Sequence, residues 1–292
     1  MRSPRQMACL LALLAFGQTD VEVNAGEGLP PLSLTREGHW LIISGPQVYG
    51  GSIKINYLEA YCRGDSATND WVKHTIIPFK NEMLSPTNQH QEIRLRDTLA
   101  DGVTVEHVIT ATADEVDFRL TAHNPTSLSS EVQWAQPCVR LGDFTGFGSA
   151  QTTNDYAYLP KCFVFLDGQL KRMPFEPWST EARYVPGQVW RAPKVSAADV
   201  NPRPLSQRVP VHGLIGCYSG DDKRIFATAW EPYQELFQGV ARCLHSDFRV
   251  GGLKPGETKH IQGKIYIVPA DARALLERYR RDFPSQGNPL EK

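Results

Sequence analysis

Short apolar runs that end at turn residues follow one another along most of this chain, and they constrain its fold more than any other feature. Within Val103–Thr110, valine, histidine and isoleucine alternate with mostly polar residues, the period of two expected of a half-buried strand. Turn signals such as Gly50-Gly51, Asp101-Gly102 and Pro255-Gly256 separate the runs. The pattern predicts an all-β fold, in which two antiparallel sheets form a sandwich. The predicted strands are His39–Ser44, Ser52–Tyr61, Val72–Pro78, Gln91–Asp97, Val103–Ala111, Glu115–His123, Glu131–Leu141, Cys162–Leu166, Leu214–Ser219, Ile225–Trp230, Val240–Asp247 and His260–Val268.

One clear helix is predicted, near the C-terminal end. Ala272–Phe283 carries apolar residues, among them Leu275 and Tyr279, at helical spacing. Asp271 is a suitable N-cap and Pro284 ends the segment. We therefore expect a structural helix docked on the sandwich.

The first 25 residues have the pattern of a secretory signal peptide. Arg2 and Arg5 precede the apolar run Met7–Phe16, and Ala25 ends a small-residue cleavage site. That run is shorter than the roughly 20 residues that span a bilayer. We expect a secreted or periplasmic protein whose mature chain has no integral membrane segment; a retained N-terminal anchor is the alternative.

Residues 26–292 are expected to form a single β-sandwich domain with one irregular excursion. Residues 173–210 are rich in proline and weakly periodic, and a loop of that length is usually functional or disordered. Trp178, Tyr184 and Trp190 argue against disorder. We expect an ordered excursion that lies over one face of a sheet; the alternative is an insert that covers a hydrophobic edge.

Composition and motifs exclude several classes of function. The net charge is −1, so no basic excess points to nucleic acid. The sequence has no glycine-rich phosphate loop, no G-x-S-x-G and no H-E-x-x-H, which argues against nucleotide enzymes, α/β-hydrolases and common zinc proteases. Beyond the signal peptide five cysteines remain, without C-x-x-C spacing. Cys138 and Cys243 lie in apolar runs and are expected to be buried free thiols, although disulfides elsewhere stay open.

Two parts of the chain resemble a known family. Val103–Asn124 (VTVEHVITATADEVDFRLTAHN) is similar to the central strands of galactose-mutarotase-like proteins, and Val240–Asp247 with Leu253–Val268 is similar to their last hairpin. The resemblance implies a two-sheet β-supersandwich, shared by mutarotases and by domains of glycoside hydrolases and polysaccharide lyases. Aldose epimerases of this fold use a histidine on a central strand and a glutamate on the penultimate strand. Here Trp134–Arg140 lacks a histidine and His245 stands near the position of the glutamate, so the resemblance does not carry over the epimerase pair.

Two strands carry polar and aromatic residues together, as a ligand-binding face would. Strict alternation in Lys54–Arg63 places Tyr57, Glu59, Tyr61 and Arg63 on one face. Such a face can stack on a sugar ring and bond its hydroxyls; the alternative is an outer face with solvated polar tips.

A second face is predicted on Trp134–Arg140. Trp134, Gln136, Cys138 and Arg140 point the same way if the strand continues through Pro137, which must interrupt the ladder or mark a bulge. An indole beside a guanidinium suits a sugar acid. The alternative is a core tryptophan with a surface arginine.

The penultimate strand carries His245 and Asp247 on one face, where the aspartate can orient the histidine as a general acid or base. The alternative is a structural hydrogen bond. The pair is also half of a metal site if Glu59, His74 or Glu231 completes it. We assign no metal ligand, and the sequence identifies no cofactor.

Together these faces indicate an exported protein that binds, and processes by lyase or hydrolase chemistry, an acidic oligo- or polysaccharide. A lyase needs an arginine for the carboxylate and a base for the adjacent proton, whereas a hydrolase needs two carboxylates, here Glu59 with Glu231 or Asp247. The alternatives are a non-catalytic carbohydrate-binding protein and a structural domain of the cell envelope. The predicted catalytic residues are His245, Tyr61, Glu59, His74 and Asp247. The predicted substrate-binding residues are Arg63, Trp134, Gln136, Arg140, Trp190, Trp230 and Glu231.

Overall fold

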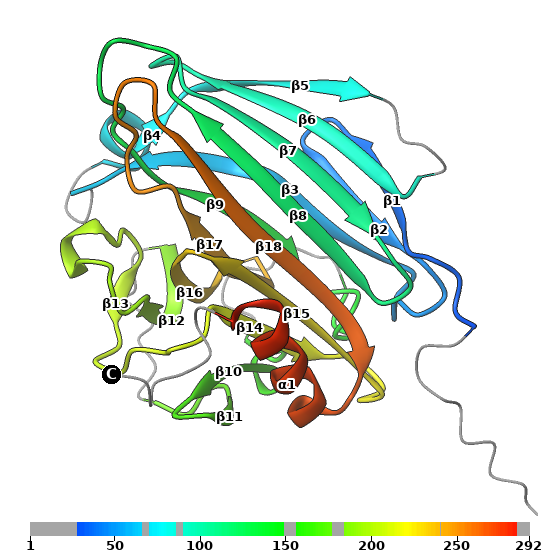
Figure 1. Cartoon of the computed structure of the whole chain (residues 1–292). Coiled ribbons are helices and arrows are strands. Elements are labelled where there is room, and N and C mark those ends of the chain that lie inside the picture. The colour runs from blue at the N-terminus through cyan, green and yellow to red at the C-terminus, as the bar shows by residue number, and fades with distance from the viewer. Residues whose placement is uncertain are drawn as a thin grey trace, which may run out of the picture.

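A computed structural model gives the structure of this chain and describes residues 28–65, 70–85, 90–148, 156–176, 184–239 and 241–284. Two large sheets pack face to face, as predicted, and a single α-helix lies near the C-terminal end (Figure 1). Every strand pair is antiparallel except the pair β12 and β13, which is parallel. The predicted all-β sandwich is therefore confirmed. The predicted signal peptide lies outside the described residues.

The first sheet, sheet A, carries the cavity described in the next subsection. In spatial order it contains β1 (Ser33–Glu37), β2 (Trp40–Ser44), β3 (Ser52–Arg63), β9 (Val132–Arg140), β17 (Cys243–Arg249), β16 (Tyr233–Gly239), β12 (Tyr184–Arg191) and β13 (Arg203–Leu205), with β4 (Ile76–Ile77) paired to β3.

The second sheet, sheet B, closes the sandwich on one side of sheet A. Its strands are, in spatial order, β11 (Gln169–Arg172), β10 (Cys162–Leu166), β14 (Leu214–Tyr218), β15 (Arg224–Glu231), β18 (Thr258–Pro269), β8 (Glu115–His123), β7 (Thr104–Ala111), β6 (Glu92–Leu99) and β5 (Phe79–Ser85).

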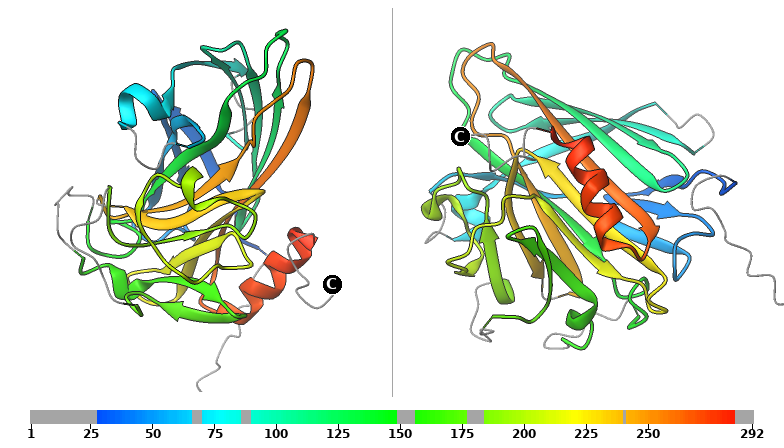
Figure 2. Two further views of the ribbon diagram at one scale, coloured as in Figure 1. Left: turned by 90° about the vertical axis from the view of Figure 1, so that its left-hand side faces the viewer. Right: turned by 60° about the horizontal axis from the view of Figure 1, so that its bottom comes forward.

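The C-terminal helix α1 (Ala272–Asp282) begins and ends close to the predicted bounds. The Asp271 side chain accepts hydrogen bonds from the amides of Arg273 and Ala274, which satisfies two of the free N–H groups at the helix start. Leu275 and Tyr279 are buried against the outer side of sheet B, so the helix covers a second apolar cluster there (Figure 2). None of the helices in the described part of the chain has both the length and the apolar character needed to cross a membrane.

Two sequence predictions differ from the structure. Val72–Pro78 was expected to be a strand, but Trp71–Thr75 forms a π-helical turn capped by the Asp70 side chain, and only Ile76–Ile77 pair with β3. Within the excursion at residues 173–210, β12 and β13 extend sheet A, so that segment is irregular only in part.

Between the two sheets lies a buried polar network that the alternation of β3 did not predict. Tyr61 donates a hydrogen bond to Asp97 (2.7 Å), and the Tyr57 hydroxyl lies 2.8 Å from Nδ1 of His107. His107 Nε2 is 3.1 Å from the same Asp97 carboxylate, which also accepts from Asn81. Burial raises the pKa of Asp97, but its contacts with His107, Asn81 and Tyr61 outweigh that effect and hold the pKa below its ordinary value.

Asp97→Asn tests this network through the pH dependence of stability. A carboxylate whose pKa is lower in the folded state stabilises the protein above the ordinary value of about 3.9, and that stabilisation is lost as the pH falls through the folded pKa. We expect a deficit in unfolding free energy of about 1–3 kcal/mol at neutral pH that shrinks below about pH 4. Urea unfolding at several pH values measures it. Asp167→Asn, whose carboxylate is 81% exposed, is the control. A deficit that persists unchanged in strong acid would contradict the assignment.

Candidate functional site

A bulge in β3 decides which of its side chains reach the outer face of sheet A, the face turned away from sheet B. Opposite Pro137 the register slips: Asn56 pairs with Cys138, but the next paired residue of β3 is Ala60, opposite Gln136. Proline lacks the N–H that the ladder needs, and a bulge on the neighbouring strand accommodates this. The predicted bulge or interruption at Pro137 is therefore confirmed, although the extra residues lie on the partner strand.

The predicted common face of Tyr57, Glu59, Tyr61 and Arg63 is wrong, because the bulge turns Glu59 to the face opposite to that of Tyr57 and Tyr61. Tyr57 and Tyr61 are buried in the core between the sheets, whereas Glu59 is exposed and turns to the outer face. Arg63 donates to the carbonyl of Ile76 and pairs with Glu131, away from Glu59. Tyr61 therefore has no access to a ligand on the outer face.

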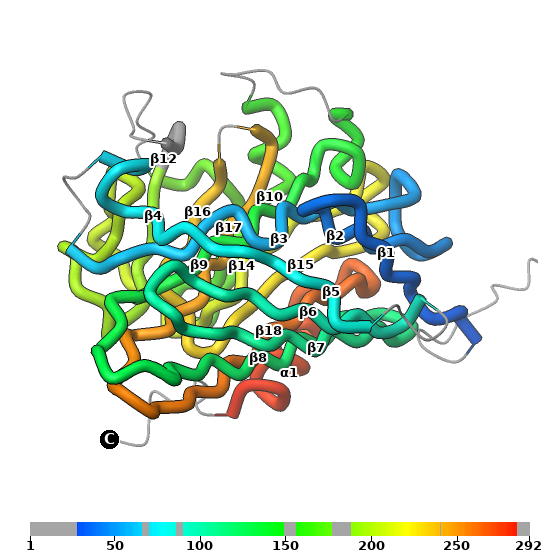
Figure 3. The backbone as a smooth tube through the Cα atoms, turned by 90° about the horizontal axis from the view of Figure 1, so that it is seen from above, coloured from blue at the N-terminus to red at the C-terminus, as the bar shows by residue number. Residues whose placement is uncertain are grey.

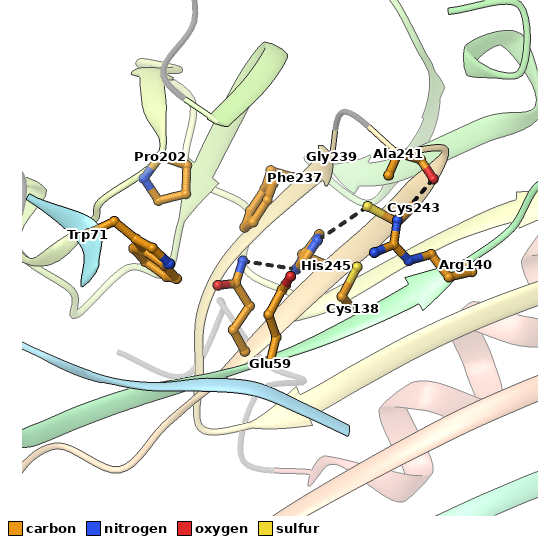
Figure 4. A pocket seen from close by; sticks show the side chains of 11 residues that line it. Glu59, Trp71, Cys138, Arg140, Pro202, Phe237, Gly239, Ala241, Cys243 and His245 are labelled. Atoms are coloured by element: carbon orange, nitrogen blue, oxygen red, sulfur yellow. Dashed lines mark hydrogen bonds between the residues drawn. The ribbon is translucent and has the colours of Figure 1, made fainter. Parts of the chain in front are cut away.

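The outer face of sheet A carries a cavity of about 210 Å³. Strands β3, β9, β16 and β17 form its floor, and the cavity is walled by Trp71 from the π-helical turn and Pro202 from the excursion. Figure 3 shows the cyan segment that carries Trp71 at the same end of the molecule as β12 and β16. The residues that line the cavity are Glu59, Trp71, Gln136, Cys138, Arg140, Pro202, Phe237, Gly239, Ala241, Cys243 and His245 (Figure 4).

The second predicted face is confirmed on β9. Gln136, Cys138 and Arg140 point into the cavity, while Ala135 and Val139 alternate with them into the core. Trp134 shares this face but is fully buried, and its ring lies beneath Trp71 with 5.9 Å between the centroids. Trp71, which the sequence analysis did not select, is thus the tryptophan that reaches the cavity.

His245 is held in place on every side. Its ring stacks on Phe237, with centroids 4.2 Å apart and an interplanar angle of 7°. Nδ1 lies 3.2 Å from the Gln136 amide and 3.4 Å from the Asp247 carboxylate, and Nε2 lies 3.4 Å from Sγ of Cys243. The predicted contact between His245 and Asp247 is present. Since both ring nitrogens are occupied and the residue is 3% exposed, His245 is poorly placed to take a proton from a sugar.

A chain of coupled ionisable groups continues below the floor of the cavity. Burial raises the pKa of Glu235 well above its usual range, and neighbouring Asp247 adds to the effect, so the neutral form of Glu235 is favoured. Burial lowers the pKa of His245, but Cys243 and Asp247 outweigh it and raise the pKa to about 10. A hydrogen bond from Cys138 holds the pKa of the Cys243 thiol well below its usual value, against the effect of burial and with help from His245. Cys243 and His245 therefore shift each other's pKa in opposite directions across a distance of 3.4 Å.

Positive charge extends from the cavity along the same face. Arg140 also lines a neighbouring cavity of about 170 Å³, together with Lys54 and Arg242. Lys54 and Cys243 lie directly across from Arg140 on the two adjacent strands. Three cations therefore gather beside the site in a protein whose net charge is −1.

Other predicted site residues lie elsewhere. His74 is exposed on the π-helical turn and does not line the cavity. Trp190 is buried in the core and stacks on Phe175, and Trp230 is buried between Phe118 and Phe248.

Glu231 lines a different cavity, formed on sheet B with His260 and Arg119. Trp190, Trp230 and Glu231 therefore cannot contribute to the site on sheet A. The structure adds three residues to the site or its floor: Phe237, Cys243 and Glu235. In the sequence they belong to segments dense in aromatic and ionisable residues, and this density could have indicated them.

No family model and no curated protein matches the chain. Solved structures that are similar to it include a putative aldose 1-epimerase from Escherichia coli K12, with TM-score 0.42 and 9% identity over 81% of this chain and 98% of that one. A galactose mutarotase-like protein from Lactobacillus casei has TM-score 0.41 and 9% identity over 81% and 99%. A polysaccharide lyase has TM-score 0.40 and 7% identity over 89% of this chain and 35% of that one. At these identities the likeness concerns the fold alone.

Gly239→Ala tests how tightly the floor of the cavity is packed. A Cβ at this position would lie 2.4 Å from Sγ of Cys243, so the strand or the sulfur must shift. We expect the substitution to lower the unfolding free energy by about 1–3 kcal/mol. The same change in a Cys243→Ala background, where the sulfur is absent, should cost clearly less, and a double-mutant cycle measures the difference. Equal costs in the two backgrounds would show that the contact is not the cause.

Proposed function

We propose that this protein binds an acidic carbohydrate in the cavity on the outer face of sheet A and acts on it. The observation that carries the proposal is that an indole, a guanidinium and a carboxylate from three separate elements line one cavity: Trp71, Arg140 and Glu59. A sugar offers an apolar ring face to an indole and hydroxyls to polar groups, and small-molecule sites combine these features.

The charge distribution favours a ligand with carboxylates. A guanidinium such as that of Arg140 can bind a carboxylate through two parallel hydrogen bonds. Lys54 and Arg242 continue the positive charge into the neighbouring cavity, which suits a chain of acidic sugars more than a single residue. We also propose that the protein is exported, as expected from residues 1–25.

The arrangement of acids favours proton removal over hydrolysis. Glycoside hydrolysis uses two carboxyl groups that flank the scissile bond. Among the described residues that line the cavity, Glu59 is the one carboxylate, because Asp247 is buried beneath His245 and Glu231 lies on sheet B.

In the proposed reaction, Arg140 neutralises the sugar carboxylate and so acidifies the proton on the adjacent carbon. Glu59 takes that proton, the released electron pair forms a carbon–carbon double bond, and the bond to the glycosidic oxygen breaks. The leaving oxygen then gains a proton from water. Trp71 holds the ring in place, and His245 supports the floor rather than reacting.

Trp71→Ala tests the location of the binding site. Loss of the indole contact, worth about 1 kcal/mol or slightly more, should weaken binding of a uronate-containing oligosaccharide about five- to tenfold in isothermal titration. Val72→Ala, in the same helical turn and 76% exposed, is the matched control and should bind as the wild type does. A neutral oligosaccharide of equal length should bind more weakly than the acidic one. Equal affinity of both variants, or preference for the neutral sugar, would refute the assignment.

Glu59→Gln tests the chemistry. Removing a general base lowers the rate about 10²- to 10⁴-fold, so formation of the unsaturated product, followed by its ultraviolet absorbance, should nearly stop while binding persists. Glu131→Gln, whose side chain is 78% exposed, should retain the wild-type rate. If the wild type binds the sugar and yields neither unsaturated ends nor new reducing ends, the protein is a binding protein without catalysis.

A further inference from the structure

Three metal-binding side chains meet at the floor of the cavity, and neither the binding nor the elimination proposed above uses them. Cys138, Cys243 and His245 each offer one ligand atom, and these atoms all lie within 4.8 Å of one another. The sulfur of Cys243 is 3.4 Å from Nε2 of His245. Around a tetrahedral zinc ion, bond lengths of about 2.3 Å to sulfur and 2.0–2.1 Å to nitrogen place two such atoms about 3.6 Å apart.

The groups around these three residues orient them as ligands. Metal-bound histidines usually donate the N–H of the second ring nitrogen to a carboxylate, a backbone carbonyl or water, which fixes the ring. Here Nδ1 of His245 lies 3.4 Å from the Asp247 carboxylate, and Nε2 is the nitrogen that faces the sulfur. The stack on Phe237 fixes the plane of the ring.

The backbone leaves room for the sulfur of Cys243. Gly239 lies on the adjacent strand β16, directly opposite Cys243, and a Cβ there would approach that sulfur to 2.4 Å. Glycine at this position thus leaves space for the Cys243 sulfur, which any larger residue would displace.

We propose that Cys138, Cys243 and His245 form a zinc-binding site whose fourth coordination position faces the cavity. Thiolate and imidazole are the ligands that zinc prefers, and three protein ligands with one open position is the arrangement of zinc sites that bind a further molecule. Both thiols lose their protons on binding, and the two thiolates balance the charge of the ion. The proposal does not depend on the carbohydrate ligand, because its test uses the metal alone.

A second pair of cysteines provides an internal comparison. Cys162 and Cys217 are both buried and lie directly opposite each other on β10 and β14. Among the described residues, a third metal-binding side chain joins Cys138 and Cys243, and none joins this pair. If zinc bound to any pair of neighbouring thiols, it would bind at both pairs of cysteines. The proposed site requires binding at Cys138 and Cys243 alone.

The first experiment needs no substitution. The full chain, reduced and freed of metal, is titrated with zinc, and we expect one equivalent to bind and to raise the melting temperature. Zinc should also protect Cys138 and Cys243 from alkylation under native conditions, as read by peptide mass spectrometry, relative to the metal-free protein. Absence of stoichiometric binding, or protection at Cys162 and Cys217 instead, would overturn the proposal.

Substitutions then locate the site. Cys138→Ser, Cys243→Ser and His245→Ala should each abolish stoichiometric binding, and Cys217→Ser should leave it intact. Asp247→Asn, which alters a residue behind the histidine, should weaken binding about 10- to 100-fold. Retained binding in all three ligand variants would overturn the proposal, as would a disulfide between Cys138 and Cys243 that forms in air even when zinc is present. If zinc binds as expected but the carbohydrate tests fail, the proposed function is refuted and the zinc site is not.

Discussion

The structure depends on one constraint: the middle strands of sheet A are covered on both faces. One face packs against sheet B, and the other is covered in part by the turn of Trp71 and by the excursion that carries Pro202. Ionisable groups on the covered face, above all Glu235 and Asp247, are therefore removed from water. A buried charge is costly unless it is neutralised or paired, which raises the pKa of Glu235 and places Asp247 against His245.

A single proline separates the two polar regions of this fold. Opposite Pro137, the bulge in β3 turns Glu59 to the outer face, while Tyr57 and Tyr61 stay in the core, where Asp97 and His107 satisfy their hydroxyls. The buried network of Tyr57, Tyr61, Asp97 and His107 links the two sheets by hydrogen bonds. The outer group lines a cavity and is free to meet a ligand.

Much of the fold follows from the sequence, because strand period, turn residues and a helix cap are local signals. Strand β16 (Tyr233–Gly239) was not predicted because it is buried at every position, polar residues included, and so shows no alternation. For the site, the face of β9 and the contact of His245 with Asp247 were predicted from period two alone. The separation of Glu59 from Tyr57 and Tyr61 was not predicted, since it depends on a proline in a partner strand, and the identity of strand partners is not written in a single sequence.

The order of strands in sheet A has a consequence for how the molecule reaches its native state. The cavity rests on β3, β9, β16 and β17, and β9 pairs with β3 on one side and with β17, from far along the chain, on the other. Such pairings incur the entropy of closing long loops before they gain stabilising contacts, which slows folding in proteins rich in non-local pairs. The ligand site thus forms only when the C-terminal third of the polypeptide has joined the N-terminal strands, so a newly made or truncated chain has no partial version of it.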